Sequence, residues 1–384
     1  MARILITGAS GFIGSHIAEE SLALGHEVWA AVRITSNRDF LTDPRIHFIN
    51  LNLNNPTLLR TQLAAAPFAT QTSTPQLDSA PQLASAPPST ASETPFYVIH
   101  AAGATKCLHR EDFLRNNLDA TRNLVEALLD LNLRPTRFIF LSSLSLFGAI
   151  KENPIPHTPD TAATTPQAAT TPQAATTAPL YPEITADDTP RPNTAYGESK
   201  LQAEQYLRTV PDLHYVILRP TGVYGPRERD YFIMARSISR HIDFAVGYTP
   251  QEITFVYVRD LVQAIMKSLT APGVERHAFF ISDGQTYNSR AFSDLLRAEL
   301  GNPWLLRICA PLWFLRAVCA VNGTICRLLG KTTTLNTDKY HILAQRNWRC
   351  DITPAIRLLG YTPQYSLQQG VQETVAWYKA HHWL

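Results

Sequence analysis

The feature that most constrains this chain is a short apolar run followed by three evenly spaced glycines. Residues 4–6 are apolar, and Gly8, Gly11 and Gly14 follow at intervals of three. The run is typical of a buried parallel strand, and a helical pattern over 12–24 follows it. In such a unit Gly8 permits a sharp turn, Gly11 lets the backbone approach a pyrophosphate, and Gly14 allows helix and strand to pack closely. Unpaired N–H groups at the helix start would bind the phosphates, so the sequence predicts a dinucleotide site here.

Strand-like and helical patterns then alternate along the chain. Apolar runs predict strands at 27–33, 46–51, 96–103, 137–145 and 214–218. Amphipathic periods predict helices at 111–131 and 195–209. Strands that alternate with helices form parallel sheets, because each helix returns the chain to the same edge. The sequence therefore predicts an α/β fold with a doubly wound parallel sheet over 1–218, followed by a smaller, mainly substrate-binding region over 219–384.

Two low-complexity stretches, at about 64–95 and 154–182, interrupt this pattern. Both are rich in Ala, Pro and Thr, and both contain repeats, such as 164–169 repeated at 170–175. Segments so poor in large apolar side chains cannot offset the entropy lost on ordering. We expect disordered insertions at the surface of the dinucleotide-binding domain.

Charge and cysteine content argue against two classes of function. The net charge is +2 with 17% charged residues, which gives no electrostatic basis for binding nucleic acid. The cysteines are odd in number and lack metal-ligand spacing, so we expect reduced thiols and no metal site: Cys107, Cys309, Cys319, Cys326 and Cys350. The chain starts directly in its first strand, which favours a cytoplasmic protein.

The end of the second predicted strand bears on the choice of cofactor. An acidic residue there would bind the adenosine ribose and favour NAD, but this chain has Arg33, with Arg38 in the loop beyond. Guanidinium groups can pair with a 2′-phosphate, so the sequence favours NADP. If the two arginines are only solvated surface residues, NAD remains the alternative.

Tyr196, Lys200 and Ser143 form a candidate catalytic set. Tyr196 and Lys200 are four residues apart, so they share one face of the predicted helix. A neighbouring ammonium group stabilises a phenolate and brings the tyrosine pKa toward neutrality. Ser143, at the end of a strand, is placed to hold a substrate hydroxyl or carbonyl while Tyr196 moves the proton and a nicotinamide moves the hydride.

Together these motifs resemble the extended short-chain dehydrogenase/reductase family, which includes NAD-dependent epimerase/dehydratases and 3β-hydroxysteroid dehydrogenase-like enzymes. The matching segments come in the family's order and span nearly the whole chain outside the insertions: 7–14, 100–103, Asn117, 141–148, 196–200, 218–226 and 256–261. The resemblance implies a Rossmann-type fold and a homodimer formed through the helices at 111–131 and 195–209.

The resemblance also implies residue roles. Ser143 falls at the catalytic Ser/Thr, with Ser142 as the alternative; Tyr196 falls at the acid/base, and Lys200 at the residue that lowers its pKa and binds the ribose. Pro220 and Thr221 fall where the family's backbone holds the nicotinamide amide. The patterns and the resemblance together give these cofactor-binding residues: Gly8, Ser10, Gly11, Phe12, Ile13, Gly14, Arg33, Arg38, Asn52, Leu53, Ala101, Ala102, Gly103, Tyr196, Lys200, Pro220, Thr221 and Val223.

The chain departs from the family's pattern in three places. Family dehydratases carry an acidic pair after the catalytic Ser/Thr, whereas Leu144 and Ser145 stand here, so we predict no dehydratase activity. Asn52 replaces the Asp that commonly holds adenine, which weakens that contact. Arg259 stands where many members have an acid.

An apolar, Trp-rich segment at 303–331 has two interpretations. Arg307, Arg316 and Arg327 divide it into runs too short for a membrane span, which needs roughly 20 residues. It is either a helical lid over the substrate pocket or a cationic amphipathic patch in peripheral contact with a membrane.

These observations predict an NAD(P)-dependent oxidoreductase that interconverts a secondary alcohol and a ketone. An apolar, steroid-like or isoprenoid-like substrate is one option. The alternative within the family is a nucleotide-sugar epimerase or reductase, with arginines available for the phosphates, namely Arg227, Arg229 and Arg236. An alternative from another class is a protein that senses NADP without turnover.

Overall fold

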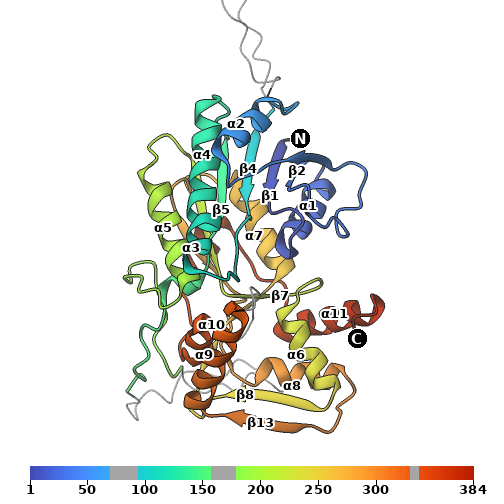
Figure 1. Ribbon diagram of the computed structural model, residues 1–384, viewed down its shortest axis with the longest axis vertical. Helices are drawn as coiled ribbons and strands as arrows, with labels where there is room; N and C mark the ends of the chain where they lie inside the picture. Colours follow the sequence, from blue (N-terminus) through green and yellow to red (C-terminus); the bar gives the residue numbers. More distant parts are fainter. Residues whose placement is uncertain (70–93, 157–178, 329–336) are drawn as a thin grey trace, which may run out of the picture.

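A seven-stranded parallel sheet forms the centre of the protein (Figure 1). The computed structural model describes residues 1–69, 94–156, 179–328 and 337–384. The strand order is β3-β2-β1-β4-β5-β6-β11, and every neighbouring pair is parallel. The strands are β1 (Arg3–Thr7), β2 (Glu27–Val32), β3 (His47–Asn50), β4 (Phe96–His100), β5 (Arg137–Leu141), β6 (Tyr215–Pro220) and β11 (Ala278–Ile281). The chain runs outward from β1 in one direction and then from β4 in the other, so the switch point lies between β1 and β4.

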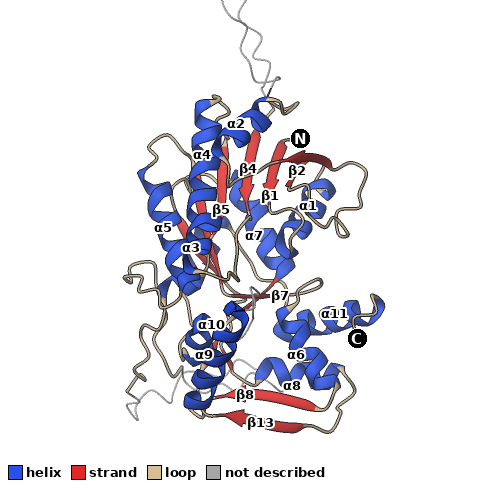
Figure 2. Cartoon of the chain, viewed as in Figure 1, coloured by secondary structure: helices blue, strands red, loops and turns tan. Residues whose placement is uncertain are grey.

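Helices cover both faces of this sheet (Figure 2). Along β1, Ile4 and Ile6 pack into one core and Leu5 into the other, as the alternation of side chains requires. The first core includes α1 (Phe12–Ala23) and α7 (Val258–Thr270), and the second includes α2 (Pro56–Ala64), α4 (Ala120–Asp130) and α5 (Ala195–Thr209). This arrangement confirms the predicted doubly wound α/β fold.

The remaining elements form the opposite end of the molecule in Figure 1. Three small two-stranded pairs join β7 (Gly222–Tyr224) to β10 (Phe255–Tyr257), β9 (Glu252–Ile253) to β12 (Tyr287–Asn288), and β8 (Ile242–Val246) to β13 (Leu306–Ala310). The helices here are α6 (Asp230–Ser239), α8 (Ala291–Glu299), α9 (Leu312–Leu328), α10 (Thr337–Ala344), the π-helical turn η4 (Ala355–Leu359) and α11 (Leu367–Ala380). Both α7 and β11 come from beyond residue 218, yet they belong to the layers of the central sheet.

The predicted helices match the structure closely. The pattern at 195–209 coincides with α5, whose Thr194 side chain caps the first turn by accepting a hydrogen bond from Gly197 N. The pattern at 111–131 corresponds to α3 (Arg110–Phe113), the π-helical segment η1 (Leu114–Asp119) and α4 in succession. The extra residue of a π turn is invisible to a 3.6-residue period, so the sequence predicted one uninterrupted helix.

The centres of the two predicted insertions, 70–93 and 157–178, lie outside the described residues. Their ends are described and packed, because Phe68 is 2% exposed and Tyr181 is 1% exposed. The predicted boundaries at 64 and 182 therefore included residues that belong to the core.

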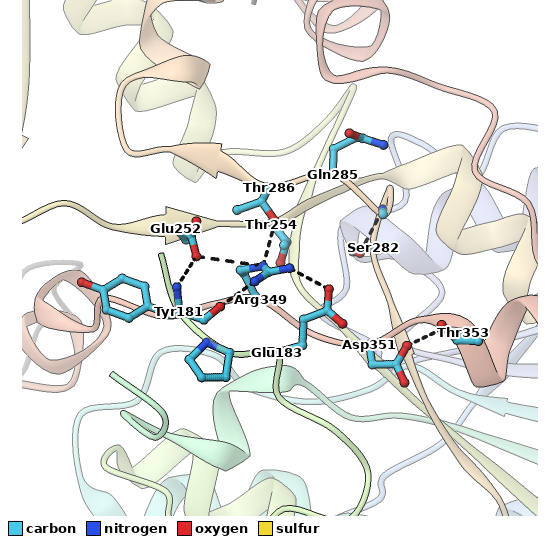
Figure 3. Close-up of polar contacts among 12 residues, drawn as sticks. Tyr181, Glu183, Glu252, Thr254, Ser282, Gln285, Thr286, Arg349, Asp351 and Thr353 are labelled. Atoms are coloured by element: carbon cyan, nitrogen blue, oxygen red, sulfur yellow. Dashed lines mark hydrogen bonds and ion pairs between the residues drawn. The ribbon is translucent and has the colours of Figure 1, made fainter. Parts of the chain in front are cut away.

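Arg349, in the C-terminal part of the chain, binds the segment that follows the second insertion (Figure 3). Its guanidinium donates to Tyr181 O at 2.5 Å, to Glu183 Oε1 at 2.9 Å and to Thr286 Oγ1 at 3.2 Å. Glu252 accepts from the backbone N–H groups of Leu180 and Tyr181 at 2.8 and 2.9 Å. Segments more than a hundred residues apart thus meet in one polar cluster.

Candidate active site

The loop between β1 and α1 has glycine at both ends, Gly8 and Gly11, with only small residues between them. Gly8 has a φ of +72°, and a Cβ at Gly14 would lie 2.1 Å from Gly8 O. Gly11 begins α1 with no side-chain cap, so no side chain covers the amide groups of the first turn. A helix start of this kind favours an anion. The loop therefore fits the pyrophosphate of a dinucleotide.

The end of β4 closes on this loop. A Cβ at Gly8 would lie 2.7 Å from Ala102 N and 2.8 Å from Ala101 O. Ala102 N donates to Thr7 Oγ1 at 3.3 Å, and Thr7 Oγ1 lies 2.7 Å from Nδ1 of the fully buried His100. The predicted cofactor residues Ala101, Ala102 and Gly103 are thus in direct reach of the glycine loop.

The two hydroxyl partners of His100 fix its tautomer. Thr121 Oγ1 donates to Asn117 O at 2.6 Å and so accepts from His100 Nε2 at 3.0 Å, which leaves Nδ1 as the acceptor from Thr7. Burial, with the Lys200 charge as a second cause, lowers the pKa of His100 to about 3 and so keeps the ring neutral. The chain of hydrogen bonds links the glycine loop to the helix that carries Asn117.

Asn117, in the π-helical segment η1, fixes the strand end beside Lys200. Its Oδ1 accepts from Ala104 N at 2.8 Å, and its Nδ2 donates to Ala104 O at 3.1 Å and to Ser199 Oγ at 2.8 Å. A Cβ at Gly103 would lie 3.0 Å from Asn117 Oδ1 and 3.2 Å from Lys200 Nζ. Gly103, Asn117 and the Tyr196–Lys200 helix therefore meet at one point.

The structure brings Ser143, Tyr196 and Lys200 together. Ser143 follows β5 and accepts from Ser145 Oγ at 2.9 Å. Lys200 Nζ donates to Leu141 O at 2.7 Å, at the end of the same strand. Burial raises the pKa of Tyr196 to about 12, and the nearby Ser143 hydroxyl opposes this rise, so the lowering that the sequence predicted is not found in the free protein. Burial lowers the pKa of Lys200 to about 8, and the Glu204 carboxylate opposes that fall.

Glu204 and Arg219 form a buried ion pair next to this set. Arg219 donates to both carboxylate oxygens of Glu204, at 3.0 and 2.6 Å, and the two residues are 5% and 1% exposed. Glu204 stands one turn after Lys200 on α5, so its charge supports the ammonium form. The sequence analysis did not single out Glu204, although its i+4 spacing from Lys200 was visible.

Two hydroxyls near the strand ends have no partner among the described residues. They are Ser142 Oγ, after β5, and Thr221 Oγ1, after β6. A buried hydroxyl without a partner is costly unless a ligand satisfies it. Pro220 ends β6, Thr221 N donates to Ile281 O at 3.1 Å, and Val223 lies in β7. These positions fit the expected contact with a polar cofactor group.

The residues expected around the adenosine end are more open. Arg33 and Arg38 are exposed, and neither forms an ion pair with a described residue; the Arg38 guanidinium lies 4.5 Å from the centre of the Phe48 ring. Asn52 Oδ1 accepts from Asn54 N at 3.2 Å, and Leu53 O accepts from Asn123 Nδ2 at 2.8 Å. The arginines are free to meet a phosphate, and nothing in their contacts selects NADP over NAD.

A cavity of about 560 Å³, a volume suited to a small-molecule ligand, lies near the start of α5, and none of Ser143, Tyr196 and Lys200 lines it. Its wall contains Ala149, Glu152, Asn193, Arg316, Cys319, Ala320, Thr337, Tyr340, His341, Ala344 and Gln345. Asn193 stands three residues before Tyr196, and Asp338 of α10 accepts from Ala195 N at 3.0 Å. The sequence analysis missed the wall residues from α10 onward, because no local pattern distinguishes them.

The segment 303–331 differs from the helical lid that the sequence suggested. Residues 306–310 form strand β13, which pairs with β8, and α9 follows with Arg316, Cys319 and Ala320 in the cavity wall. The strand forms because β8 offers a parallel partner that lies about sixty residues earlier, which no local period reveals.

Comparison with known proteins identifies the family. The sequence model of the NAD dependent epimerase/dehydratase family matches residues 4–70 and 88–282, which is more than half of the chain. The chain belongs to this family. As a member it is an enzyme of the NAD(P)-dependent epimerase, dehydratase or dehydrogenase type, within the extended short-chain dehydrogenase/reductase group.

Individual family members are distant. The chain is 25% identical over 203 residues to a decarboxylating sterol-4-alpha-carboxylate 3-dehydrogenase of Saccharomyces cerevisiae, a match covering 48% of this chain and 57% of that protein. It is 25% identical to an uncharacterized UDP-glucose epimerase of Bacillus subtilis, over 98% of this chain and 97% of the other. The UDP-glucose 4-epimerase structure of Thermotoga maritima has a TM-score of 0.67 at 19% identity, with 99% of each chain covered. That likeness shows the shared fold.

Proposed function

We propose that this protein interconverts a secondary alcohol and a ketone with NADP, using Ser143, Tyr196 and Lys200. The observation that carries the proposal is that Lys200 Nζ bonds Leu141 O at 2.7 Å, which brings the Tyr196–Lys200 face of α5 to the end of β5, where Ser143 lies close enough to affect the Tyr196 pKa. Bound nicotinamide dinucleotide supplies or accepts the hydride. In reduction the Tyr196 hydroxyl donates its proton to the carbonyl oxygen, and in oxidation the phenolate takes the proton from the alcohol.

The chain's own residues hold and orient the reactants. The amides around Gly8–Gly14, including Ser10, Phe12 and Ile13, receive the pyrophosphate, and Arg33 and Arg38 the 2′-phosphate. Asn52 and Leu53 border the adenine. The residues at the nicotinamide end are Ala101, Ala102, Gly103, Pro220, Thr221 and Val223. Lys200 binds the ribose and stabilises the Tyr196 phenolate, while Glu204 keeps Lys200 charged.

The Tyr196→Phe variant tests the assignment of the proton. It removes the transferable proton but keeps the ring, so turnover should fall by about 10²–10⁴-fold with little change in NADPH affinity. Fluorescence titrations with NADPH and NADH measure both affinities. Unchanged turnover would remove Tyr196 from the mechanism. A protein that binds NADPH and turns over no substrate of either class below would instead be an NADP sensor.

A nucleotide-sugar epimerase or reductase is the second candidate, and the polar wall of the cavity favours it. Glu152, Asn193 and Gln345 offer hydrogen bonds to hydroxyl groups, and Arg316 offers a cation to a phosphate. The names of the relatives include both a sterol and UDP-glucose. Assays with dehydroepiandrosterone and with UDP-glucose separate the two: oxidation of the steroid supports the first, and conversion of the sugar supports the second.

We also propose a homodimer in which α4 and α5 of each protomer pack against their counterparts. The two helices lie side by side on one face of the sheet, which leaves their outer faces for a partner (Figure 1). Sedimentation velocity should give twice the mass of one chain. A sedimenting monomer at micromolar concentration would contradict the proposal.

A further inference from the structure

The outer face of the β8–β13 pair is apolar along its whole length. The register places Leu306 beside Ile242, Ile308 beside Phe244, and Ala310 beside Val246. Paired residues of parallel strands share a face, so these six side chains form one surface. Phe244 is 61% exposed, Leu306 is 56% exposed and Ile308 is 38% exposed. On the other face Asp243 is buried and paired with Arg290 at 3.0 Å and Arg307 at 3.5 Å.

Exposed aromatic side chains stand at both ends of this pair. At the start of the strands Trp304 is 69% exposed and stacks on His241, with ring centres 4.6 Å apart. At the other end Tyr248 is 75% exposed and donates to Cys309 O at 3.2 Å. The first turn of α9 adds Trp313, 72% exposed, and Phe314, 48% exposed. We call the six strand residues and these four aromatic residues the apolar end surface.

The apolar end surface consists of ten neighbouring residues, whereas exposed apolar side chains on a soluble protein usually occur singly. Soluble proteins rarely expose a continuous apolar patch of this extent without a partner. It lies at the end of the molecule opposite the N-terminal part of the sheet, with β13 outermost (Figures 1 and 2). A docking partner there would not obstruct the glycine loop.

The surrounding charge is positive. In the described part of 303–331 Arg316 is an exposed cation, whereas Arg307 is paired with Asp243 and Asp294. Arg236 and Arg240 are exposed on α6 and at its end, just before β8. Two nearby carboxylates, those of Asp243 and Asp294, are both paired with Arg307. An anionic partner therefore does not meet either of them as a free charge.

We propose that the apolar end surface docks this protein on an anionic phospholipid membrane. Tryptophan and tyrosine favour the boundary between lipid headgroups and hydrocarbon, and exposed aliphatic side chains gain by insertion below it. Nearby cations add electrostatic attraction to an anionic surface. Among the described helices none is long and apolar enough to cross a bilayer. The contact is therefore peripheral, and it goes beyond the proposed alcohol–ketone chemistry.

Vesicle flotation tests the proposal, with phosphatidylcholine vesicles that contain or lack phosphatidylglycerol. At low salt the protein should float with the anionic vesicles, and less with the neutral ones. The Phe244→Ser/Leu306→Ser and Trp313→Ser/Phe314→Ser variants should each weaken binding by about tenfold or more, because they remove apolar area that the membrane would bury. Arg236→Gln/Arg240→Gln should reduce binding only to the anionic vesicles.

Matched controls separate docking from general stickiness and from catalysis. Leu358→Ser and Leu58→Ser remove apolar side chains that are 48% and 41% exposed on other parts of the surface, so both should float like the parent. Tyr196→Phe should also float, whether or not the catalytic proposal holds. Protein that stays at the bottom with anionic vesicles would overturn the proposal. Loss of self-association in the serine variants, measured by sedimentation, would assign the surface to a second copy instead.

Discussion

Gly8 and Gly25 have nearly the same backbone conformation, with φ of +72° and +77°, but different surroundings. A Cβ at Gly25 meets nothing within 4 Å, whereas one at Gly8 meets the backbone of Ala101 and Ala102 at 2.7–2.8 Å. Gly25→Ala should therefore cost only the left-handed strain, about 1–2 kcal/mol. Gly8→Ala should cost about 1–3 kcal/mol more and abolish dinucleotide binding. Urea unfolding and NADPH titration measure both effects, and equal costs would show that the loop relaxes freely.

Asp283 makes stability depend on pH. Burial raises its pKa from 3.8 to about 7, although Gln285 N and the Tyr287 hydroxyl donate to it. The folded state thus holds the proton more tightly than the unfolded state, so this group's contribution to the free energy of unfolding falls as the pH rises from about 4 to about 7.

The Asp283→Asn variant should lose that dependence. The parent loses stability as the pH rises toward the folded-state pKa of about 7, and the variant does not. In urea unfolding experiments between pH 5 and pH 8, the free energy of unfolding of the variant, relative to that of the parent, should therefore rise with pH. Asp187→Asn, at an exposed carboxylate, is the control and should leave the pH profile of the parent unchanged. Parallel profiles for the parent and Asp283→Asn would contradict this account.

Single residues were predictable where chemistry and local spacing coincide. The three glycines, Tyr196 and Lys200 carried their signal in sequence, and the structure brings both groups to the same sheet edge. Glu204 and Gln345 became conspicuous only through burial or missing partners, which depend on segments distant in the chain. The roles of the cofactor residues remain predictions.

At the scale of elements, the π-helical segment η1 lets one helix serve both the core and the site. Asn117→Ala would leave Ala104 N, Ala104 O and Ser199 Oγ without their side-chain partner. We expect unfolding to become easier by about 2–3 kcal/mol, since buried groups lose their hydrogen bonds. NADPH affinity should also fall, because Asn117 lies next to Gly103 and bonds Ser199, the neighbour of Lys200, and so positions both residues.

Asn116→Ala is the matched control in the same segment. Asn116 bonds Asp112 O at 2.7 Å and the exposed Asn54 at 3.1 Å, so its loss should cost less than about 1 kcal/mol. Urea unfolding of the two variants checks the difference. Equal losses would mean that Asn117 does no more than fill space.

Periodicity predicted the elements whose own residues carry a clear strand or helix pattern. The strands β1 to β6 and helix α5 fall close to their expected positions, although β1 pairs with β4, and β5 with β6, across long stretches of chain. The sequence analysis did not find β11 or the β8–β13 pair, which lie after residue 218, where the regular alternation ends. A short apolar run does not state where it will pair.

At the scale of the whole molecule, Arg349 joins three segments that the sequence keeps apart. Arg349→Leu should lower the free energy of unfolding by about 2–3 kcal/mol, because charged hydrogen bonds to Tyr181 O and Glu183 are lost. Arg357→Leu, at an exposed position, should change it by less than about 0.5 kcal/mol. Denaturant unfolding compares them, and an equal effect would show that the cluster in Figure 3 is not stabilising.

Because β11 is an edge strand from late in the chain, the central sheet cannot be fully formed until residues 278–281 have been synthesised. The ribosome makes β1 first, yet β1 occupies the middle of the sheet, and the strand at one edge arrives only with residues 278–281. Helix α7, which packs on α1, β5 and β6, also comes late. Until then β6 has an unpaired edge and one sheet face lacks its cover. A nascent chain ending at residue 218 therefore exposes a strand edge and apolar surface that the finished protein covers.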